Sequence, residues 1–173
     1  MLETRDKYAL VIRRAGVNET EAAFALLKQF FAEEDFATSP EQIRKHLEAA
    51  LAEDAGAIFL AWQKEKAVGV ATVTTVISIE WGRFAELEDL YVLPQARRSG
   101  VARALIGAVK AWCALKGCAA VGVVVTPEAQ AAHDLHGFYQ KHSFQVSART
   151  LLYADLTQPH QPQPAEDNDE HND

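Results

Sequence analysis

The stretch "LEDLYVLPQARRSGVARALIGAVKAW", which runs from Leu87 to Trp112, changes character in its middle and decides the fold. Its first part alternates apolar residues as a strand does, and Pro94 ends that pattern. A short basic loop follows and ends at Ser99-Gly100. Apolar residues then recur at steps of four and three, which predicts an amphipathic helix carrying Val101, Leu105, Val109 and Trp112 on one face.

The loop before this helix has the features of an anion site. The start of a helix leaves backbone N–H groups without intrahelical partners, and the helix dipole adds about half a positive charge there. Gly100 lets a ligand approach the main chain, and Arg97, Arg98 and Arg103 add positive charge. The pattern favours a seat for a phosphate or pyrophosphate, although a solvated basic loop fits it equally well.

Other chemistry is disfavoured by what the sequence lacks. It contains no GxxxxGK[ST], which disfavours a nucleotide triphosphatase, and no GxGxxG, which disfavours a dinucleotide-binding fold. Cys113 and Cys118 match neither a CxxC motif nor a disulfide framework, so we expect ordinary apolar side chains. No acidic or cysteine partner nearby completes a metal set with His133 and His136, and we expect no metal site.

Outward from this stretch, strands and helices alternate in a recognisable order. Ser39-Pro40 marks a helix start, with a capping serine and a proline at the first helical position, and we expect Gly56 to end that helix. The element order is β-α-α-β-β-β-α-β-α-β, so we expect an α/β (α+β) fold with a mixed sheet and helices on both faces. The remaining expected elements are a first strand at Tyr8–Ala15, a helix capped at Asn18, strands in "AIFLAWQ" and "AVGVATVTTVISI", a turn at Trp81–Arg83, a doubly buried strand "AAVGVVVT", a helix from Thr126 to about Lys141, and a closing strand "FQVSARTLLYADL".

The composition indicates one domain and a separate tail. We expect the domain to span residues 8–157, and the Pro- and Gln-containing acidic segment 158–173 to be disordered. The formal charge of −7 owes much to that tail, so there is no broad basic surface and we expect no nucleic-acid partner. No apolar run approaches the roughly 20 residues that span a bilayer, and the N-terminus is a poor signal peptide, so we expect no membrane association and a cytoplasmic location.

Two segments resemble motifs of the GNAT acetyltransferase superfamily. Arg97–Ala102 fits the Q/R-x-x-G-x-G/A signature of motif A, with the permitted alanine in the last place. The segment "HDLHGFYQKHSF", from His133 to Phe144, resembles motif B through Phe138-Tyr139 and Phe144, although Ser143 replaces the usual glycine. The element order agrees with this superfamily from Tyr8 to Leu156, which implies its mixed, mostly antiparallel central sheet.

The resemblance implies acetyl-CoA as cosubstrate and acetyl transfer to an amine. The coenzyme's pyrophosphate would lie on the amides of Arg98–Arg103, and its pantetheine arm would pair with the main chain of the strand before the loop, where that strand carries a bulge and splays from its neighbour. The cofactor-binding residues that follow from the resemblance are Leu90, Tyr91, Val92, Arg97, Arg98, Ser99, Gly100, Val101, Ala102, Arg103, His133 and Phe138.

Amine acetylation needs a base for the ammonium and an acid for the departing thiolate. Following the family pattern, we expect Tyr139 to donate a proton to the thiolate, since a phenol with an ordinary pKa near 10 stays protonated at neutral pH. Glu88 is our first choice of base and Glu86 the second, directly or through water; alternatively each binds a cationic substrate or is a plain surface group. In a regular strand Glu86 and Glu88 share a face and Asp89 lies opposite, but a bulge would break that alternation.

The acceptor stays open at this point. The segment "FFAEEDF", at Phe30–Phe36, offers acids among phenylalanines for a cationic amine, or is simply a solvated helix end. The sequence "LEDLYVLP" is also similar to a segment of aminoglycoside 6'-N-acetyltransferases. A small primary amine, a polyamine, an aminoglycoside and a protein lysine or N-terminus all remain candidates, as does a GNAT-fold module that binds CoA without transferring acetyl. Dimers are frequent among similar proteins, so we also expect a homodimer.

Overall fold

The computed structural model describes residues 9–156, and the expected acidic tail at 158–173 lies outside them. A five-stranded sheet has the order β1-β2-β3-β4-β5, with antiparallel pairs except for the parallel pair β4–β5. The predicted mixed, mostly antiparallel sheet is therefore confirmed. The strands are β1 (Leu10–Arg14), β2 (Gly56–Gln63), β3 (Lys66–Ser78), β4 (Gly82–Val92) and β5 (Ala120–Gly122).

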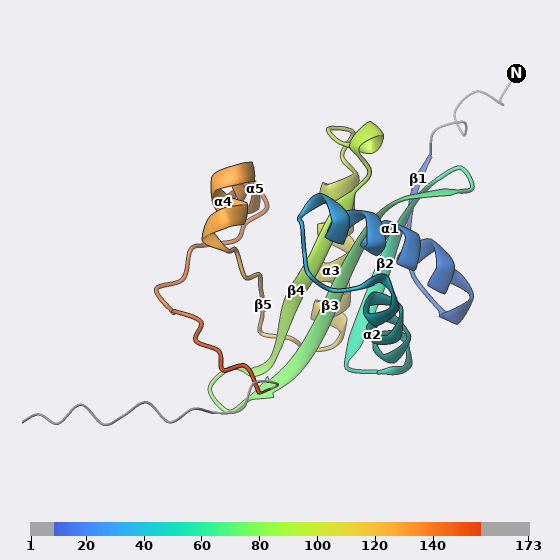
Figure 1. Cartoon of the computed structure of the whole chain (residues 1–173). Coiled ribbons are helices and arrows are strands. Elements are labelled where there is room, and N and C mark those ends of the chain that lie inside the picture. Colours follow the sequence, from blue (N-terminus) through green and yellow to red (C-terminus); the bar gives the residue numbers. More distant parts are fainter. Residues whose placement is uncertain (1–8, 157–173) are drawn as a thin grey trace, which may run out of the picture.

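Helices cover both faces of the sheet, as predicted (Figure 1). Helices α1 and α2 lie on one face and α3 lies on the other, while α4 and α5 stand apart beyond the β5 edge. Two short 3₁₀ turns, η1 and η2, precede α1 and α3. The helical elements are η1 (Val17–Glu19), α1 (Thr20–Glu33), α2 (Pro40–Ala52), η2 (Pro94–Ala96), α3 (Val101–Leu115), α4 (Pro127–His133) and α5 (Leu135–Gln140).

Local sequence signals explain where several elements begin. Ser39 caps α2 by accepting a hydrogen bond from the Gln42 N–H at 3.2 Å, and Pro40 occupies the first helical position as predicted. The helix ends at Ala52, however, and Gly56 begins β2 rather than ending α2. Before α1, the Glu19 carboxylate accepts from the Gly16 N–H at 2.8 Å and caps the turn η1, whereas α1 itself follows Glu19, so the predicted Asn18 caps neither element.

The core fills both faces of the sheet, against α3 on one side and against α1 and α2 on the other. The start of α3 comes unusually near to β3, because a Cβ on Gly69 would lie 3.0 Å from a Val101 methyl group and 3.1 Å from the Tyr91 carbonyl oxygen. Glycine at position 69 thus lets the helix start, with its loop, sit directly over the sheet. The most fully buried side chains of the core are Leu60, Val70, Val73, Leu87, Val101, Leu105, Val109 and Cys113.

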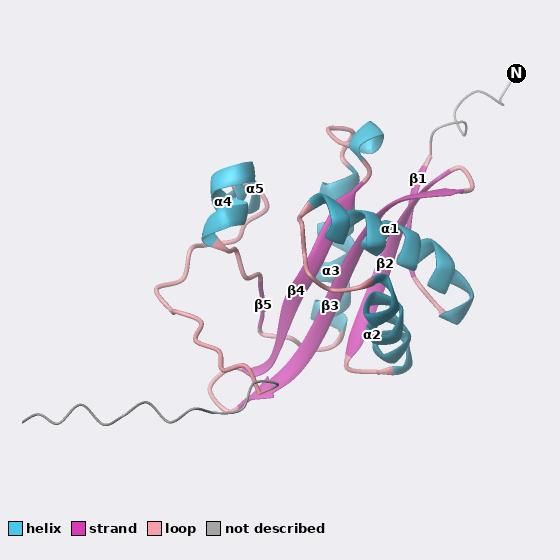
Figure 2. Ribbon diagram, viewed as in Figure 1, coloured by secondary structure: helices cyan, strands magenta, loops and turns pink. Residues whose placement is uncertain are grey.

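Three expectations for the C-terminal third are wrong. The strand in "AAVGVVVT" has only three residues, half-buried rather than buried on both faces, because the chain leaves β4 beyond Gly122. The single helix from Thr126 is broken at Asp134, whose left-handed backbone (φ 47°) separates α4 from α5; the short polar side chain of aspartate tolerates that conformation. Figure 2 shows residues 145–156 as an extended loop without a strand.

That loop is exposed rather than paired with the sheet. Strand-forming residues adopt a ladder only where a partner strand accepts their backbone hydrogen bonds, and no such strand lies beside residues 145–156 in the described part of the chain. Arg149 instead anchors the loop to the β3–β4 turn, through an ion pair with Glu80 at 2.6 Å and a position above the Trp81 ring. Within residues 9–156, no helix has the length and apolar character needed to cross a bilayer.

Candidate active site

The loop at the start of α3 offers main-chain amides to a ligand. Gly100 is the residue before the helix; its left-handed φ of 87° favours glycine, and a Cβ there would meet nothing within 4 Å. The first intrahelical bond comes from the Ala104 N–H to the Gly100 carbonyl at 3.0 Å. The three preceding N–H groups, those of Val101, Ala102 and Arg103, therefore surround an open space at the positive end of the helix dipole.

The arginines of the loop have different surroundings. Arg98 and Arg103 are exposed at its mouth, where their charge can attract phosphate. Arg97 instead turns toward α1: its Nε donates to the Val92 carbonyl at 2.9 Å, and its guanidinium donates to Glu33 at 2.6 Å. The structure thus brings Arg98 and Arg103 to the proposed phosphate seat, whereas Arg97 ties the end of β4 to α1.

Tyr91 completes the junction between β4 and α1. Its hydroxyl donates to the Glu33 carboxylate at 2.6 Å, and its ring packs 5.4 Å from Phe30. Burial, together with that carboxylate, raises the pKa of Tyr91 to about 12. The bond from Tyr91, followed by Arg97, lowers the pKa of Glu33. The side chain of Tyr91 therefore fixes the strand, and only its main chain remains near the expected coenzyme path.

The edge of β4 beyond Glu86 is free on the side of β5. In the described part of the chain, β4 pairs with β5 only over Phe84–Glu86. The Leu93 N–H bonds to β3, and because peptide groups alternate along a strand, those of Leu90 and Val92 face the open side. This is the splayed edge that the resemblance implies for the pantetheine arm, with the Val92 carbonyl already taken by Arg97.

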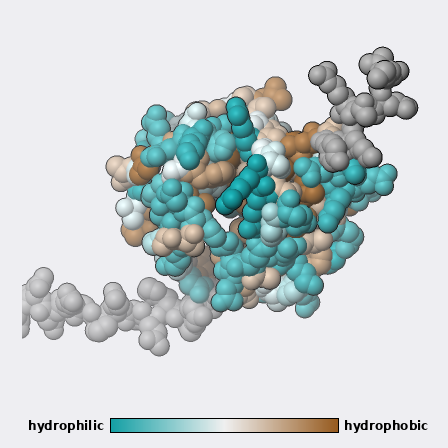
Figure 3. Space-filling view, turned by 90° about the horizontal axis from the view of Figure 1, so that it is seen from above, coloured by the Kyte–Doolittle hydropathy of each residue, from teal (hydrophilic) through white to brown (hydrophobic). Residues whose placement is uncertain are grey.

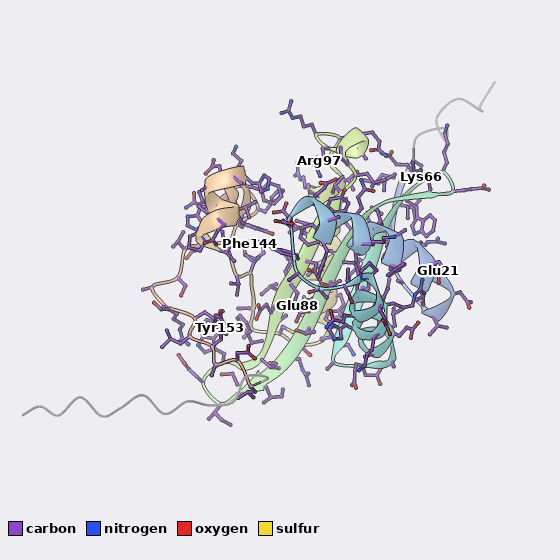
Figure 4. All side chains as sticks on the ribbon, in the orientation of Figure 1. Glu21, Lys66, Glu88, Arg97, Phe144 and Tyr153 are labelled. Atoms are coloured by element: carbon purple, nitrogen blue, oxygen red, sulfur yellow. The ribbon has the colours of Figure 1, made fainter. Side chains whose placement is uncertain are left out.

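A β-bulge in β4, which the family resemblance implies, breaks the regular alternation that would place Asp89 opposite Glu86 and Glu88. The β3–β4 register pairs Val73 with Leu87 but Thr72 with Asp89, so Glu88 is an extra residue in β4. The alternation therefore shifts by one, and Asp89 joins Glu86 and Glu88 on the face of α1 and α2, whereas Leu90 and Val92 turn to the face of α3. Figure 4 shows Glu88 midway along β4, on the side toward Phe144.

The three carboxylates of β4 sit in different environments. Glu88 is exposed and accepts from the Thr74 hydroxyl at 2.8 Å. Partial burial, with a contribution from Glu88, raises the pKa of Glu86. The pKa of Asp89 is raised as well, chiefly by burial, even though its carboxylate accepts from the Thr72 hydroxyl at 2.6 Å. In a regular strand Asp89 would lie on the opposite face from Glu86 and Glu88. The bulge places it on the same face, within the candidate site.

Tyr139 is buried in an aromatic group on α5, and of the three acids only Asp89 acts on its hydroxyl. Its side chain is only 9% exposed, and its ring packs against Phe138 at 5.0 Å and Phe144 at 5.3 Å. Burial raises the pKa of Tyr139 to about 12, and the second cause is the negative charge of Asp89 on β4. The hydroxyl is therefore protonated and able to donate throughout the physiological range.

The altered positions of the second motif have a structural explanation. Ser143, where the family has glycine, adopts a left-handed φ of 63°, so the turn keeps the conformation that glycine would favour. Phe138 packs on His142 with ring centroids 4.9 Å apart, inside the aromatic group around Tyr139. Burial, then Lys110 and Arg103, lowers the pKa of His142, so this histidine is neutral at physiological pH.

His133 lies in a different place from the phosphate loop. Its Nε2 is 3.2 Å from the Glu34 carboxylate at the end of α1, so this contact spans from α4 to α1. Within "FFAEEDF", two of the three acids are thus engaged, Glu33 with Tyr91 and Glu34 with His133. The expected acidic cradle at that segment is largely occupied by structural contacts, which leaves Asp35 and the acids of β4 as candidates for a substrate contact.

The site opens to solvent. Seen from above in Figure 3, the surface is hollowed near its centre, in line with the space between α5 and β4 in Figure 1, and hydrophilic residues gather around the hollow. Within residues 9–156, no group of three or more histidine, cysteine or acidic side chains is placed to hold a metal ion.

Comparisons with known proteins agree with this geometry. The profile of the Acetyltransferase (GNAT) family matches residues 21–144. The chain is 39% identical over 102 residues to an aminoglycoside N(6')-acetyltransferase type 1 of Stenotrophomonas maltophilia, a match that covers 54% of this chain and 67% of that protein. It is 36% identical over 67 residues to the enzyme of the same name from Salmonella typhimurium, of which it covers 44%.

Solved structures extend the likeness to most of the chain. The aminoglycoside N-acetyltransferase AAC(6')-Iy in complex with CoA has a TM-score of 0.73 and 26% identity, covering 86% of this chain and 96% of that one. An integron cassette protein from a salt-marsh metagenome has a TM-score of 0.74 and 27% identity, covering 86% and 91%. These likenesses show that the chain belongs to the GNAT acetyltransferase family and is an acetyl-CoA-dependent N-acetyltransferase.

Proposed function

We propose that the chain transfers the acetyl group of acetyl-CoA directly to a primary amine of a small cationic molecule. Tyr139 donates a proton to the departing thiolate, and the carboxylates of β4 hold the amine and take up its proton, directly or through water. The observation that carries this proposal is the buried Tyr139 hydroxyl, which is influenced by the charge of Asp89, together with the free edge of β4. The coenzyme's pyrophosphate lies on the amides that follow Gly100.

The acidic face of β4 supports a cationic acceptor. Glu86, Glu88 and Asp89 supply three carboxylates within one strand segment, and an alkylammonium group is attracted to such a cluster. Several relatives are named as aminoglycoside acetyltransferases, so aminoglycosides come first among the acceptors to test. Polyamines, simpler primary amines and protein lysines carry the same ammonium chemistry and belong in the same panel.

The test is acetyl-CoA-dependent release of free thiol across that panel. We expect turnover with at least one small cationic amine and none with neutral molecules of similar size. If CoA binds but no amine, small molecule or peptide promotes thiol release, the chain is a CoA-binding module and the proposed activity is wrong. Running the full-length chain beside a version that ends at Thr157 shows whether the acidic tail affects acceptor access.

We also propose that two copies associate through the turn between β3 and β4 and the loop that lies beside it. Several large apolar side chains of the β3–β4 turn and of the loop at 145–156 are exposed to solvent, and Ile79 is fully exposed. A second copy buries both segments at once, and strand-forming residues of the loop gain a pairing partner. The exposed apolar residues here are Val76, Ile77, Ile79, Trp81, Leu151, Leu152 and Leu156.

Sedimentation velocity tests this association. Wild type is expected to sediment as a dimer, and Ile79→Asp combined with Leu152→Asp is expected to give monomers. Val17→Asp, at a similarly exposed apolar residue on η1, is the matched control and leaves the dimer intact. A wild-type monomer at micromolar concentration contradicts the proposal.

A cytoplasmic location and the lack of nucleic-acid or membrane partners stay predictions from the composition. The formal charge of −7 opposes binding to phosphate backbones and to anionic lipids. Cell fractionation and a mobility-shift assay with DNA and RNA check them.

A further inference from the structure

The bulge in β4 gives Asp89 two contacts with one partner. The Thr72 hydroxyl donates to the Asp89 carboxylate at 2.6 Å, and the Asp89 main-chain N–H donates to the same Thr72 oxygen at 3.1 Å. A side chain held by both its carboxylate and its own backbone has little rotational freedom. Asp89 is therefore fixed in direction, whereas the exposed Glu88 extends from the bulge itself and Glu86 lies two residues before it.

Asp89 is also the carboxylate whose charge acts on the hydroxyl of Tyr139. Burial, ahead of the charge on neighbouring Glu88, raises the pKa of Asp89, and the charge of Asp89 in turn raises the pKa of Tyr139. Glu86 and Glu88 do not contribute to the raised pKa of Tyr139. Of the three acids, Asp89 alone combines proximity to the expected proton donor with an environment that favours accepting a proton.

We propose that Asp89 is the residue that receives the proton of the acceptor ammonium, and that Glu86 and Glu88 hold the cation without taking its proton. This assignment deepens the proposed function and rests on it. It replaces Glu88, the first choice from the sequence, because the bulge moves Asp89 onto the face of the acids and fixes it there.

Asp89 and Tyr139 each take part in one of the two proton transfers of the reaction. The ammonium loses one proton to Asp89, and the free amine then forms the new C–N bond as the C–S bond breaks. The departing thiolate takes the proton of Tyr139, and the second proton lost by the nitrogen restores the tyrosine hydroxyl. Asp89 finally releases its proton to water, so one proton leaves for each amide and free thiol formed.

When Asp89 takes up the ammonium proton, Tyr139 becomes more acidic, before the thiolate departs. While Asp89 is ionised, its charge helps to hold the pKa of Tyr139 at about 12, which disfavours donation. Once Asp89 has accepted the ammonium proton, that charge is gone and the phenol becomes a stronger acid. The hydroxyl is therefore a better donor only after the nucleophile has been made, which couples the two proton transfers.

The groups that face Asp89 define its pH dependence. Glu88 on its own strand raises the pKa of Asp89, Thr72 on β3 lowers it, and Tyr139 on α5 is neutral below about pH 12. From α1, Glu33 is directed to Tyr91 and Arg97 instead. Because Asp89 must be ionised to act, kcat/KM should rise with pH through a pKa above the ordinary value for aspartate.

The experiment compares pH profiles of kcat/KM for single variants with the amine found in the panel. Asp89→Asn should lower kcat/KM about 100-fold at pH 7 and abolish its rise with pH. Glu88→Gln and Glu86→Gln should raise KM several-fold and keep that rise. Glu65→Gln, in the turn between β2 and β3, is the matched control and leaves the profile unchanged.

Thr72→Val gives a second, independent measurement. Loss of the Thr72 hydroxyl bond raises the pKa of Asp89, so the rise of kcat/KM should move to higher pH, and the plateau should fall because Asp89 loses the bonds that fix its direction. No such shift is expected if Glu86 or Glu88 is the base. Titration calorimetry with CoA and thermal melting confirm that each variant is folded. Because ionised Asp89 is disfavoured in the folded chain, Asp89→Asn should melt no lower than wild type at pH 7.

The outcomes separate this inference from the proposed function. If wild type acetylates the amine but Asp89→Asn is equally active, or if Glu88→Gln or Glu86→Gln alone removes the rise with pH, the assignment to Asp89 is wrong and the proposed function stands. An unmoved profile in Thr72→Val also contradicts it. If wild type acetylates nothing in the panel, the proposed function itself fails.

Discussion

The loop at 97–103 and the strand segment at 86–89 both belong to the active site that we propose, and in it they act through different parts of the chain. In the loop, the ligand-binding groups are main-chain amides, and their direction is set by the helix start and by the positive φ of Gly100. In the strand, the working groups are carboxylates, and their direction is set by a single extra residue in the β3–β4 ladder.

This difference predicts which amino-acid substitutions each region tolerates. Amides are present whatever the side chains are, so the loop is damaged mainly by substitutions that alter its backbone or fill its open space. In β4, the backbone can stay intact while exchange of one carboxylate for an amide removes the chemistry. Substitutions in the loop should therefore affect coenzyme affinity, and those around β4 should affect turnover.

The largest effect is expected for Gly100→Glu. The new side chain must adopt a left-handed backbone and places a carboxylate in the space meant for phosphate. We expect CoA affinity, measured by titration calorimetry, to fall by at least about 100-fold, which corresponds to about 3 kcal/mol.

Gly82→Glu is the matched control for that variant. Gly82 also has a positive φ, of 72°, and open space around its Cβ position, but it lies in the turn at the start of β4. It should suffer the same backbone strain and keep its affinity for CoA. Unchanged affinity in Gly100→Glu would refute the placement of the pyrophosphate at this helix start.

The second effect is on turnover alone. Tyr139→Phe keeps the packing of the ring on Phe138 and Phe144 but removes the proton that the thiolate needs. We expect kcat to fall at least about tenfold with little change in the dissociation constant of CoA. Tyr153→Phe, at a tyrosine that is 88% exposed, should behave as wild type. A Tyr139→Phe enzyme of normal kcat would exclude the acid role.

The third comparison lies inside the loop, between Arg97 and Arg98. Arg97→Ala removes the bonds to Val92 and Glu33, so we expect the free energy of unfolding to fall by about 1 kcal/mol after solvent screening is allowed for. Arg98→Ala removes only a charge at the phosphate seat and should weaken CoA binding about threefold to tenfold at low salt. Thermal melting and calorimetry on both variants separate the roles, and equal loss of CoA affinity in the two would show that Arg97 contacts phosphate.

Much of the fold could be predicted because its signals are local. The Ser39-Pro40 start of α2, the glycine before α3 and the apolar segments of β2 and β3 are each recognisable within a few residues, and the structure confirms them. The turn at Gly117, with φ 74°, likewise ends α3 as its sequence indicates. The loop before α3, where we propose that phosphate binds, is also predicted from local sequence signals.

The features that could not be predicted depend on contacts with residues far away in the sequence. Arg97 turns from the phosphate seat because Glu33, 64 residues earlier, accepts its bond. The bulge that brings Asp89 into the site arises where β4 pairs with Thr72 on β3, and neither strand reveals it alone. The expected closing strand fails for the same reason, because its residues meet no partner strand in the described chain.

The smallest effect is expected at Ser143, where the chain departs from its family. Ser143 holds a left-handed φ of 63°, so Ser143→Gly should relieve strain, and the greater freedom of glycine in the unfolded chain offsets part of that gain. We expect a rise of about 0.5–1 kcal/mol in the free energy of unfolding, or about 1–4 °C in Tm. Gln140→Gly, at the helical end of α5, should lower stability instead. Because the backbone of the turn already has the conformation that glycine favours, CoA affinity and kcat should stay the same in Ser143→Gly. A loss of stability in that variant would mean that the serine side chain, and not the turn geometry, is what the position requires.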